Sequence, residues 1–217
     1  VTAVDRATDI TVQNTVAPEL QLTGYLTGSG DYLCSNETEL TVTAKDPSVT
    51  LGACTWYVND TEVRNQDGSA YTRATYKHSV ENSAYLAFKV SAVSLAGCPA
   101  SNTIVQSFQV YPQPKLDWDA ASASSPVQPG DQVSVTANLV KTTSANYKYL
   151  WKHDGPAQTN PPTYTDGGTT ASAATSATSS VVLAGGADED SSPYYFQVQV
   201  EDKYSCHSEQ ISKTITL

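Results

Sequence analysis

The sequence predicts an all-β protein built from two tandem β-sandwich domains, and two internal repeats carry the prediction. Residues 41–60 and 134–154 each contain an alternating strand, a polar loop and a second strand with a central tryptophan. An alternating apolar run that precedes Cys98 also recurs before Cys206. Because side chains alternate between the two faces of a strand, such runs indicate half-buried strands. Two repeats in 217 residues leave about a hundred residues for each, the usual size of a seven-stranded sandwich.

The elements follow from alternation interrupted by Gly, Asn, Asp and Pro turns. In a first domain, residues 18–112, we expect strands near 18–26, 37–45, 53–60, 70–78, 84–94 and 103–111. In a second domain, residues 113–217, we expect strands near 115–119, 131–140, 146–153, 175–183, 193–202 and 208–217.

Two stretches fall outside this repeat. Residues 1–17 alternate only around Ile10 and Val12, and form either the last strand of a preceding repeat or the first strand of the first domain. The second domain is longer, and its extra residues lie in the small, polar stretch 165–180. We expect that stretch to be a long loop or an edge segment rather than core.

Composition narrows the range of partners and compartments. The formal charge is −10, from 12 basic against 22 acidic residues, and would repel phosphate backbones and anionic lipids. We therefore expect no nucleic-acid partner and, since no apolar run approaches the ~18 residues of a spanning helix, no membrane insertion. Charged residues make up only 16% of the chain, which favours an extracellular all-β protein. The chain contains no methionine, so we expect a mature product or an excised fragment.

The two central tryptophans, Trp56 and Trp151, are expected in the cores. A large ring on the third strand of a sandwich packs between the two sheets, as it does in immunoglobulin-like domains.

The four cysteines predict disulfides, because they lack CxxC spacing and accompany only three histidines. Cys54 just before the third strand and Cys98 just after the sixth would lie at the same end of the first domain, and can pair. Cys34 would lie at the other end of that domain, facing Cys206 of the second domain across Pro112–Pro114. An inter-domain bond between Cys34 and Cys206 follows. The competing pairing joins Cys34 to Cys98, with Cys54 and Cys206 free or joined elsewhere.

Four segments resemble a known family: CSNETELTVTA at 34–44, CTWYVND at 54–60, YLAFKVSAVSLAGC at 85–98 and YYFQVQVEDKYSC at 194–206. They are similar to the bacterial Ig-like and PKD-like repeats of very large cell-surface proteins, such as the type IX-secreted adhesins of gliding motility. The resemblance covers about residues 18–217 and implies two tandem immunoglobulin-like (PKD-like) β-sandwich domains. The second domain lacks the opening cysteine, and WKHDG at 151–155 only partly matches the WDFGDG type of motif that marks PKD domains.

No motif proposes catalysis, so we expect neither an enzyme nor an organic cofactor. The histidines His78, His153 and His207 are scattered and are expected to be exposed. Asp188, Asp190 and Asp202 are candidate calcium ligands, because oxygen-rich loops at a sandwich end suit Ca²⁺. The alternative for them is a solvated acidic turn.

These observations predict a stalk, spacer or adhesin module of a secreted or cell-surface bacterial protein. Its partners would be neighbouring repeats of the same polypeptide, with a surface glycan or protein as ligand. The alternative function is an accessory glycan-binding module of a larger secreted enzyme, because aromatic faces stack on sugars. Tyr71, Tyr76 and Trp118 are its candidate residues, although β-propensity alone explains tyrosines in strands.

Overall fold

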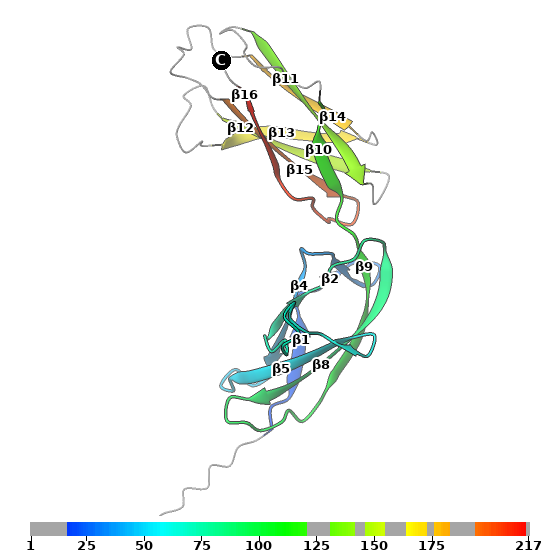
Figure 1. Cartoon of the computed structure of the whole chain (residues 1–217), viewed down its shortest axis with the longest axis vertical. Coiled ribbons are helices and arrows are strands. Elements are labelled where there is room, and N and C mark those ends of the chain that lie inside the picture. The colour runs from blue at the N-terminus through cyan, green and yellow to red at the C-terminus, as the bar shows by residue number, and fades with distance from the viewer. Residues whose placement is uncertain are drawn as a thin grey trace, which may run out of the picture. The chain divides into compact units, whose positions relative to one another are not determined.

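The protein is all-β, as its computed structural model shows (Figure 1). The structure describes residues 17–120, 131–141, 146–154, 164–172, 176–182 and 194–215. Over these ranges every regular element is a strand, and no helix has the length and apolar character of a membrane span. The predicted fold class is confirmed.

The chain divides into two compact units. Unit 1 comprises residues 1–24, 39–76 and 86–108, and unit 2 comprises residues 25–38, 77–85 and 109–217. These units do not follow the predicted domain boundary at residue 112, because residues 25–38 and 77–85 belong to the same unit as the C-terminal half. The boundary at 112 and the role of residues 1–17 stay predictions, and residues 1–16 lie outside the described residues.

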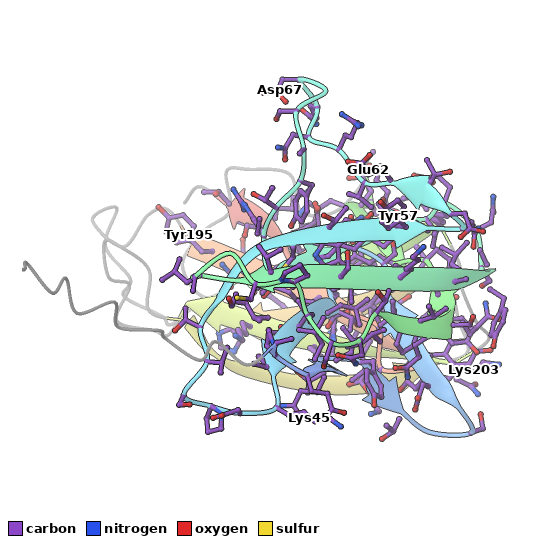
Figure 2. The ribbon with its side chains drawn as sticks, turned by 90° about the horizontal axis from the view of Figure 1, so that it is seen from below. Lys45, Tyr57, Glu62, Asp67, Tyr195 and Lys203 are labelled. Atoms are coloured by element: carbon purple, nitrogen blue, oxygen red, sulfur yellow. A yellow bond between two sulfur atoms is a disulfide. The ribbon has the colours of Figure 1, made fainter. Side chains whose placement is uncertain are left out.

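Unit 1 contains a three-stranded sheet of order β1-β4-β7, formed by Leu20–Thr23, Glu39–Ala44 and Thr75–Lys77, in which β1 and β4 are antiparallel. It also holds β5 (Leu51–Val58), which pairs with β6 (Thr61–Glu62) and with β8 (Ala84–Ser94). Asn59 and Asp60 make the tight β5–β6 turn with positive φ, a conformation that Asn and Asp tolerate well. Figure 2 shows Asp67 at the tip of the loop that follows Glu62.

The core of unit 1 is built by alternation along these strands. Leu40, Val42 and Ala44 are buried on β4, while the residues between them are not. Trp56 is fully buried, and its indole N–H donates to the carbonyl of Arg73 at 2.8 Å. A buried indole with a satisfied N–H is the expected arrangement for a core tryptophan.

In unit 2, β3 (Asp31–Cys34) pairs with β2 (Leu26–Thr27) and runs parallel to the end of β9 (Ile104–Tyr111). Cys34 lies opposite Tyr111 in that register. These strands belong to a six-stranded sheet of order β2-β3-β9-β8-β5-β6, and neither β2 nor β3 was predicted as a separate strand.

The rest of unit 2 is a sandwich of two sheets. One sheet has the order β10-β11-β14 and the other has the order β13-β12-β15-β16. The strands are β10 (Lys115–Trp118), β11 (Gln132–Lys141), β12 (Tyr147–Asp154), β13 (Tyr164–Ser172), β14 (Ser176–Val182), β15 (Tyr194–Asp202) and β16 (Ile211–Ile215). The first, second and fifth of these strands thus face the third, sixth and seventh, with an added edge strand. This is the strand order of an immunoglobulin-like sandwich.

One buried cluster fills the space between these two sheets, and Trp151 at its centre is 2% exposed. Its members come from both sheets and alternate with less buried residues along the strands, as a sandwich core requires. They are Leu116, Val133, Val135, Ala137 and Ala177 from one sheet and Tyr147, Tyr149, Trp151, Phe196, Val198, Val200 and Ile215 from the other.

All twelve predicted strands are present, and the structure adds the strands β2, β3, β6 and β13. Residues 165–172 of the small, polar stretch belong to the edge strand β13, paired along β12, as an edge segment was expected. The expectation that the stretch lies outside the core is wrong for Ala177, which β14 places in the core. The strand β5 begins at Leu51 rather than at residue 53, and its pairing with β8 shifts register between Leu51 and Cys54. An irregular register of this kind lets a strand run through residues that show no clean alternation.

Candidate functional site

The candidate functional site is a cluster around the disulfide that joins Cys34 to Cys206. The two Cα atoms are 5.3 Å apart, and the two residues are 1% and 0% exposed. Both cysteines belong to unit 2. The structure therefore contains the bond that the positions of the cysteines favoured. We refer to this bond with Glu37, His207, Tyr111, Tyr204 and Gln113 as the disulfide cluster.

Glu37 and His207 form the polar side of the disulfide cluster. The Glu37 carboxylate accepts from the backbone N–H of His207 at 2.8 Å and lies 2.6 Å from His207 Nδ1. The second carboxylate near this ring belongs to Glu201, whose oxygen is 3.8 Å from Nε2. The His207 ring therefore lies between two carboxylates.

Tyr111 and Tyr204 form the aromatic side of the cluster. Their rings are stacked, with centroids 3.7 Å apart and an interplanar angle of 11°. Tyr32 meets the edge of the Tyr111 ring at 5.8 Å. Burial raises the pKa of the Tyr111 phenol, and its hydrogen bond with Tyr204 raises it further. Tyr111 therefore stays neutral at ordinary pH, and the stack remains an uncharged contact.

Backbone contacts hold the same elements together. Gln113 donates to the carbonyl of His207 at 3.1 Å, and the N–H of Ser35 donates to the carbonyl of Tyr111 at 2.8 Å. On the other side of the bond, the N–H of Cys34 donates to the Thr38 hydroxyl at 2.8 Å. The cysteines are thus held by hydrogen bonds and ring contacts as well as by the covalent bond.

Asp202 builds the turn that carries Cys206. Its carboxylate accepts from the N–H of Tyr204 at 2.8 Å and from the N–H of Cys206 at 3.0 Å, and the residue is 4% exposed. Asp202 was a candidate calcium ligand, and in the structure it closes a turn. Asp188 and Asp190 lie outside the described residues. Within the described part of the chain, no group of three or more His, Cys, Asp or Glu side chains is placed to hold a metal ion.

The predicted bond between Cys54 and Cys98 is absent from the described structure, which is a correction. Cys54 lies inside β5 and not before it, on the same core-facing side as Trp56, and is 0% exposed. Burial raises the pKa of the Cys54 thiol above its ordinary range. Cys98 lies in the turn after β8, where its backbone N–H donates to the Ser94 hydroxyl at 3.1 Å. The prediction was wrong because it placed Cys54 at the end of its strand, whereas β5 already begins at Leu51.

The three aromatic residues proposed for sugar binding are engaged in packing. Tyr76 lies 5.6 Å from the ring of Trp56, and Tyr71 meets Tyr76 edge-on at 5.6 Å while its hydroxyl donates to the carbonyl of Thr75. In unit 2, Trp118 lies 6.2 Å from Trp151. Each of the three is partly buried.

A cavity of about 460 Å³ in unit 2 carries charges of both signs. Lys141 and Glu81 in its lining form an ion pair at 2.6 Å. The Ser35 hydroxyl in the lining exchanges hydrogen bonds with the backbone of Val80, so it is held by backbone groups and not by a base. The lining residues are Ser35, Asn36, Val80, Glu81, Gln113, Pro114, Lys115, Leu116, Lys141, Glu209 and Ile211.

Sequence reasoning missed the residues that surround the disulfide. It expected exposed histidines, whereas His78, His153 and His207 are all partly buried. Glu37 and His207 are 170 positions apart, so no local pattern connects them. A usable signal existed in their distance from the cysteines, because Glu37 follows Cys34 by three residues and His207 follows Cys206 directly.

The sequence matches no protein-family model and no curated protein. Among solved structures, the chain is similar to a protein from Corynebacterium diphtheriae described as membrane anchored, with a TM-score of 0.30 and 10% identity over 94% of this chain and 57% of that one. It is also similar to Rst D1-D2 (TM-score 0.29, 10% identity, 92% of this chain and 95% of that one). A third is the D00-D0 domain of intimin (TM-score 0.26, 14% identity, 91% and 100%). At these TM-scores the likenesses establish neither a family nor a function.

Proposed function

We propose that this chain is a non-enzymatic, tandem Ig-like segment of an exported bacterial surface protein, and that it acts as a stiffened stalk or spacer. The observation that carries the proposal is the buried Cys34–Cys206 bond, which joins the predicted first domain to the predicted second. A flexible linker between two sandwiches would ordinarily allow them to swing against each other. A covalent tie in addition to the linker removes most of that freedom.

The chemistry of the bond supports an extracellular place of action. Structural disulfides persist in oxidising compartments and are rare in the reducing cytosol. The charge of −10 on the chain opposes binding to nucleic acid and to anionic lipid. We propose neighbouring repeats of the same polypeptide as its partners, with the type IX-secreted adhesins of gliding bacteria as the closest functional analogy.

The proposal that the chain is not an enzyme rests on its polar groups. A nucleophile needs a base within hydrogen-bond reach and a group that orients the base. His207 in the disulfide cluster contacts Glu37 and Glu201, and no Ser, Thr or Cys side chain is recorded as hydrogen-bonded to its ring among the described residues. We accordingly propose no organic cofactor, and Ca²⁺ binding at Asp188 and Asp190 stays a prediction that metal titration would test.

Small-angle X-ray scattering of the oxidised and reduced protein tests the stalk proposal. We expect reduction, or Cys34→Ser, to broaden the distribution of interatomic distances while near-ultraviolet circular dichroism shows that the tryptophan cores stay packed. Cys54→Ser is the matched control, because Cys54 takes no part in the tie, and it should scatter like the parent. Identical scattering with and without the bond would overturn the proposal. Glycan binding that is lost in Tyr71→Ala would favour the alternative of a glycan-binding module.

A further inference from the structure

The Cys34–Cys206 bond closes a loop that contains nearly the whole fold. The two cysteines are separated by 172 positions. Residues 35–205 lie inside the loop and include every strand from β4 to β15. Outside it lie residues 1–33 and 207–217, and the described strands there are β1, β2, β16 and most of β3. This covalent topology does not depend on how the parts of the molecule are arranged in space.

We propose that the bond diverts tension around the sandwich cores, so that a pull on the two ends of the chain passes from residue 34 directly to residue 206. Covalent connectivity alone dictates this path. The disulfide is a much shorter covalent route between residues 34 and 206 than the chain inside the loop, so the disulfide carries the tension and the loop does not. The biological purpose of this property rests on the proposed stalk function. The mechanical property itself does not depend on that function.

The length that force can extract from the chain measures the effect. A fully extended chain spans at most about 3.5 Å per residue, so the whole chain would reach roughly 750 Å. With the bond intact, only the residues outside the loop can be extended, and they span roughly 150 Å. The intact bond therefore reduces the length of chain that force can extend to about one fifth.

The surroundings of the bond suit this role. Both cysteines are almost completely buried, so a soluble reductant has little access to the sulfur atoms. Cys34 ends β3, whose parallel pairing with β9 is continued by the hydrogen bond from Ser35 to Tyr111. The contact between Glu37 and His207 joins the residues that follow each cysteine. Tension that reaches the bond thus meets residues that are already held together.

The core strands inside the loop are the ones that tension would otherwise expose. They include β5 with Trp56 and β12 with Trp151, and both tryptophans are buried. The strands β1 and β16 each lie at the edge of their own sheet. Extraction of either strand leaves the loop closed. We therefore expect a stretched, oxidised molecule to lose edge strands without a full extension of either core.

Single-molecule force spectroscopy on the full chain, held through handles at its two ends and flanked by marker domains, tests the proposal. For the oxidised protein we expect a total gain in contour length of no more than about 150 Å. For the protein pre-reduced under unfolding conditions we expect about fivefold more. Cys54→Ser, the matched control, should keep the short gain.

Cys34→Ser and Cys206→Ser should each show the long gain without reductant, and either variant suffices if the other fails to fold. A long gain in the oxidised parent protein would overturn the proposal. A short gain that persists in both cysteine variants would also overturn it, because something other than this bond would then limit extension. These results are independent of scattering in the absence of force, so the failure of the stalk proposal and the failure of this inference are distinguishable.

Discussion

The turn after β8 and the turn after β15 have the same backbone and different cysteine chemistry. In the first turn the N–H of Ser94 donates to the carbonyl of Cys98 at 2.7 Å, and in the second the N–H of Asp202 donates to the carbonyl of Cys206 at 3.0 Å. Cys206 is bonded to Cys34, whereas Cys98 is not bonded to the cysteine predicted for it. The turn conformation alone therefore does not decide which cysteine is cross-linked.

The two turns also differ in the side chain that closes them. The Ser94 hydroxyl accepts one backbone N–H, that of Cys98, at 3.1 Å. The Asp202 carboxylate accepts two, from Tyr204 and Cys206. A charged acceptor with two donors holds its turn more firmly than a hydroxyl with one. The firmer turn is the one that presents a cysteine for the disulfide.

Replacement of these two side chains by alanine should give the largest difference between the turns. Asp202→Ala leaves two N–H groups in a buried turn without their acceptor, and we expect a loss of about 3 kcal/mol in the free energy of unfolding. Ser94→Ala removes one neutral acceptor and should cost about 1 kcal/mol. Urea denaturation measures both. Equal losses would show that the carboxylate adds nothing, and Asp202→Ser should bring the second turn to the level of the first.

A second comparison concerns Cys54 and Tyr149, which each precede the central tryptophan by two residues and are each 0% exposed. Burial raises the pKa of Tyr149 from 10.0 to about 12, with a smaller contribution from Tyr147. Burial also raises the pKa of Cys54 from 9.0. In both groups the fold favours the neutral form. Their contribution to stability is therefore complete below the unfolded pKa and is lost as pH rises through the folded one.

This difference in pKa should separate the two positions in alkaline solution. In the parent protein, the free energy of unfolding should begin to fall near pH 9, where the unfolded Cys54 thiol ionises, and fall further between about pH 10 and 12 as unfolded Tyr149 does. Tyr149→Phe should reduce the upper phase by about 2 kcal/mol, while tyrosines whose pKa is also raised, such as Tyr111, supply the rest. Cys54→Ala should abolish the lower phase. Urea midpoints across this range measure both. An upper phase that is unchanged in Tyr149→Phe would contradict the assignment.

The strands could be predicted because alternation is a local pattern in the sequence. The disulfide cluster could not be predicted, since its contacts join residues that are far apart in the sequence. Phe88 and Val90 alternate with less buried residues, as do Phe196 and Val198, so β8 and β15 could be recognised from the sequence. The edge strand β13 has small polar residues and no alternation, and its pairing with β12 defines it. The position of Cys54 depended on an irregular register after Leu51 that no sequence pattern reveals.

The disulfide was partly predictable for a related reason. Strand direction places cysteines at sandwich ends, and that reasoning favoured Cys34 with Cys206. The same reasoning failed for Cys54, because an error of a few residues in the start of β5 turns a strand-end position into a core position. The contact of Glu37 with His207 could be reached only after the disulfide was assumed, since both are neighbours of its cysteines.

The smallest expected effects come from the positive-φ residue in each turn, Gly97 with φ 85° and Ser205 with φ 56°. A Cβ at Gly97 would meet no atom within 4 Å, so Gly97→Ala should cost only the conformational penalty of about 1 kcal/mol. Ser205→Gly relieves that penalty and should stabilise by about 0.5 kcal/mol. Thermal unfolding measures both changes. A stabilising Gly97→Ala or a destabilising Ser205→Gly would contradict the equivalence of the two turns.

Peptide mapping of the non-reduced protein tests the central claim most directly. The protein is unfolded without reductant, its thiols are alkylated, and the digest is analysed by mass spectrometry. We predict one cross-linked peptide pair containing Cys34 and Cys206, with Cys54 recovered in alkylated form. Recovery of Cys34 linked to Cys98, or of alkylated Cys34 and Cys206, would contradict the account of a covalent tie across the chain.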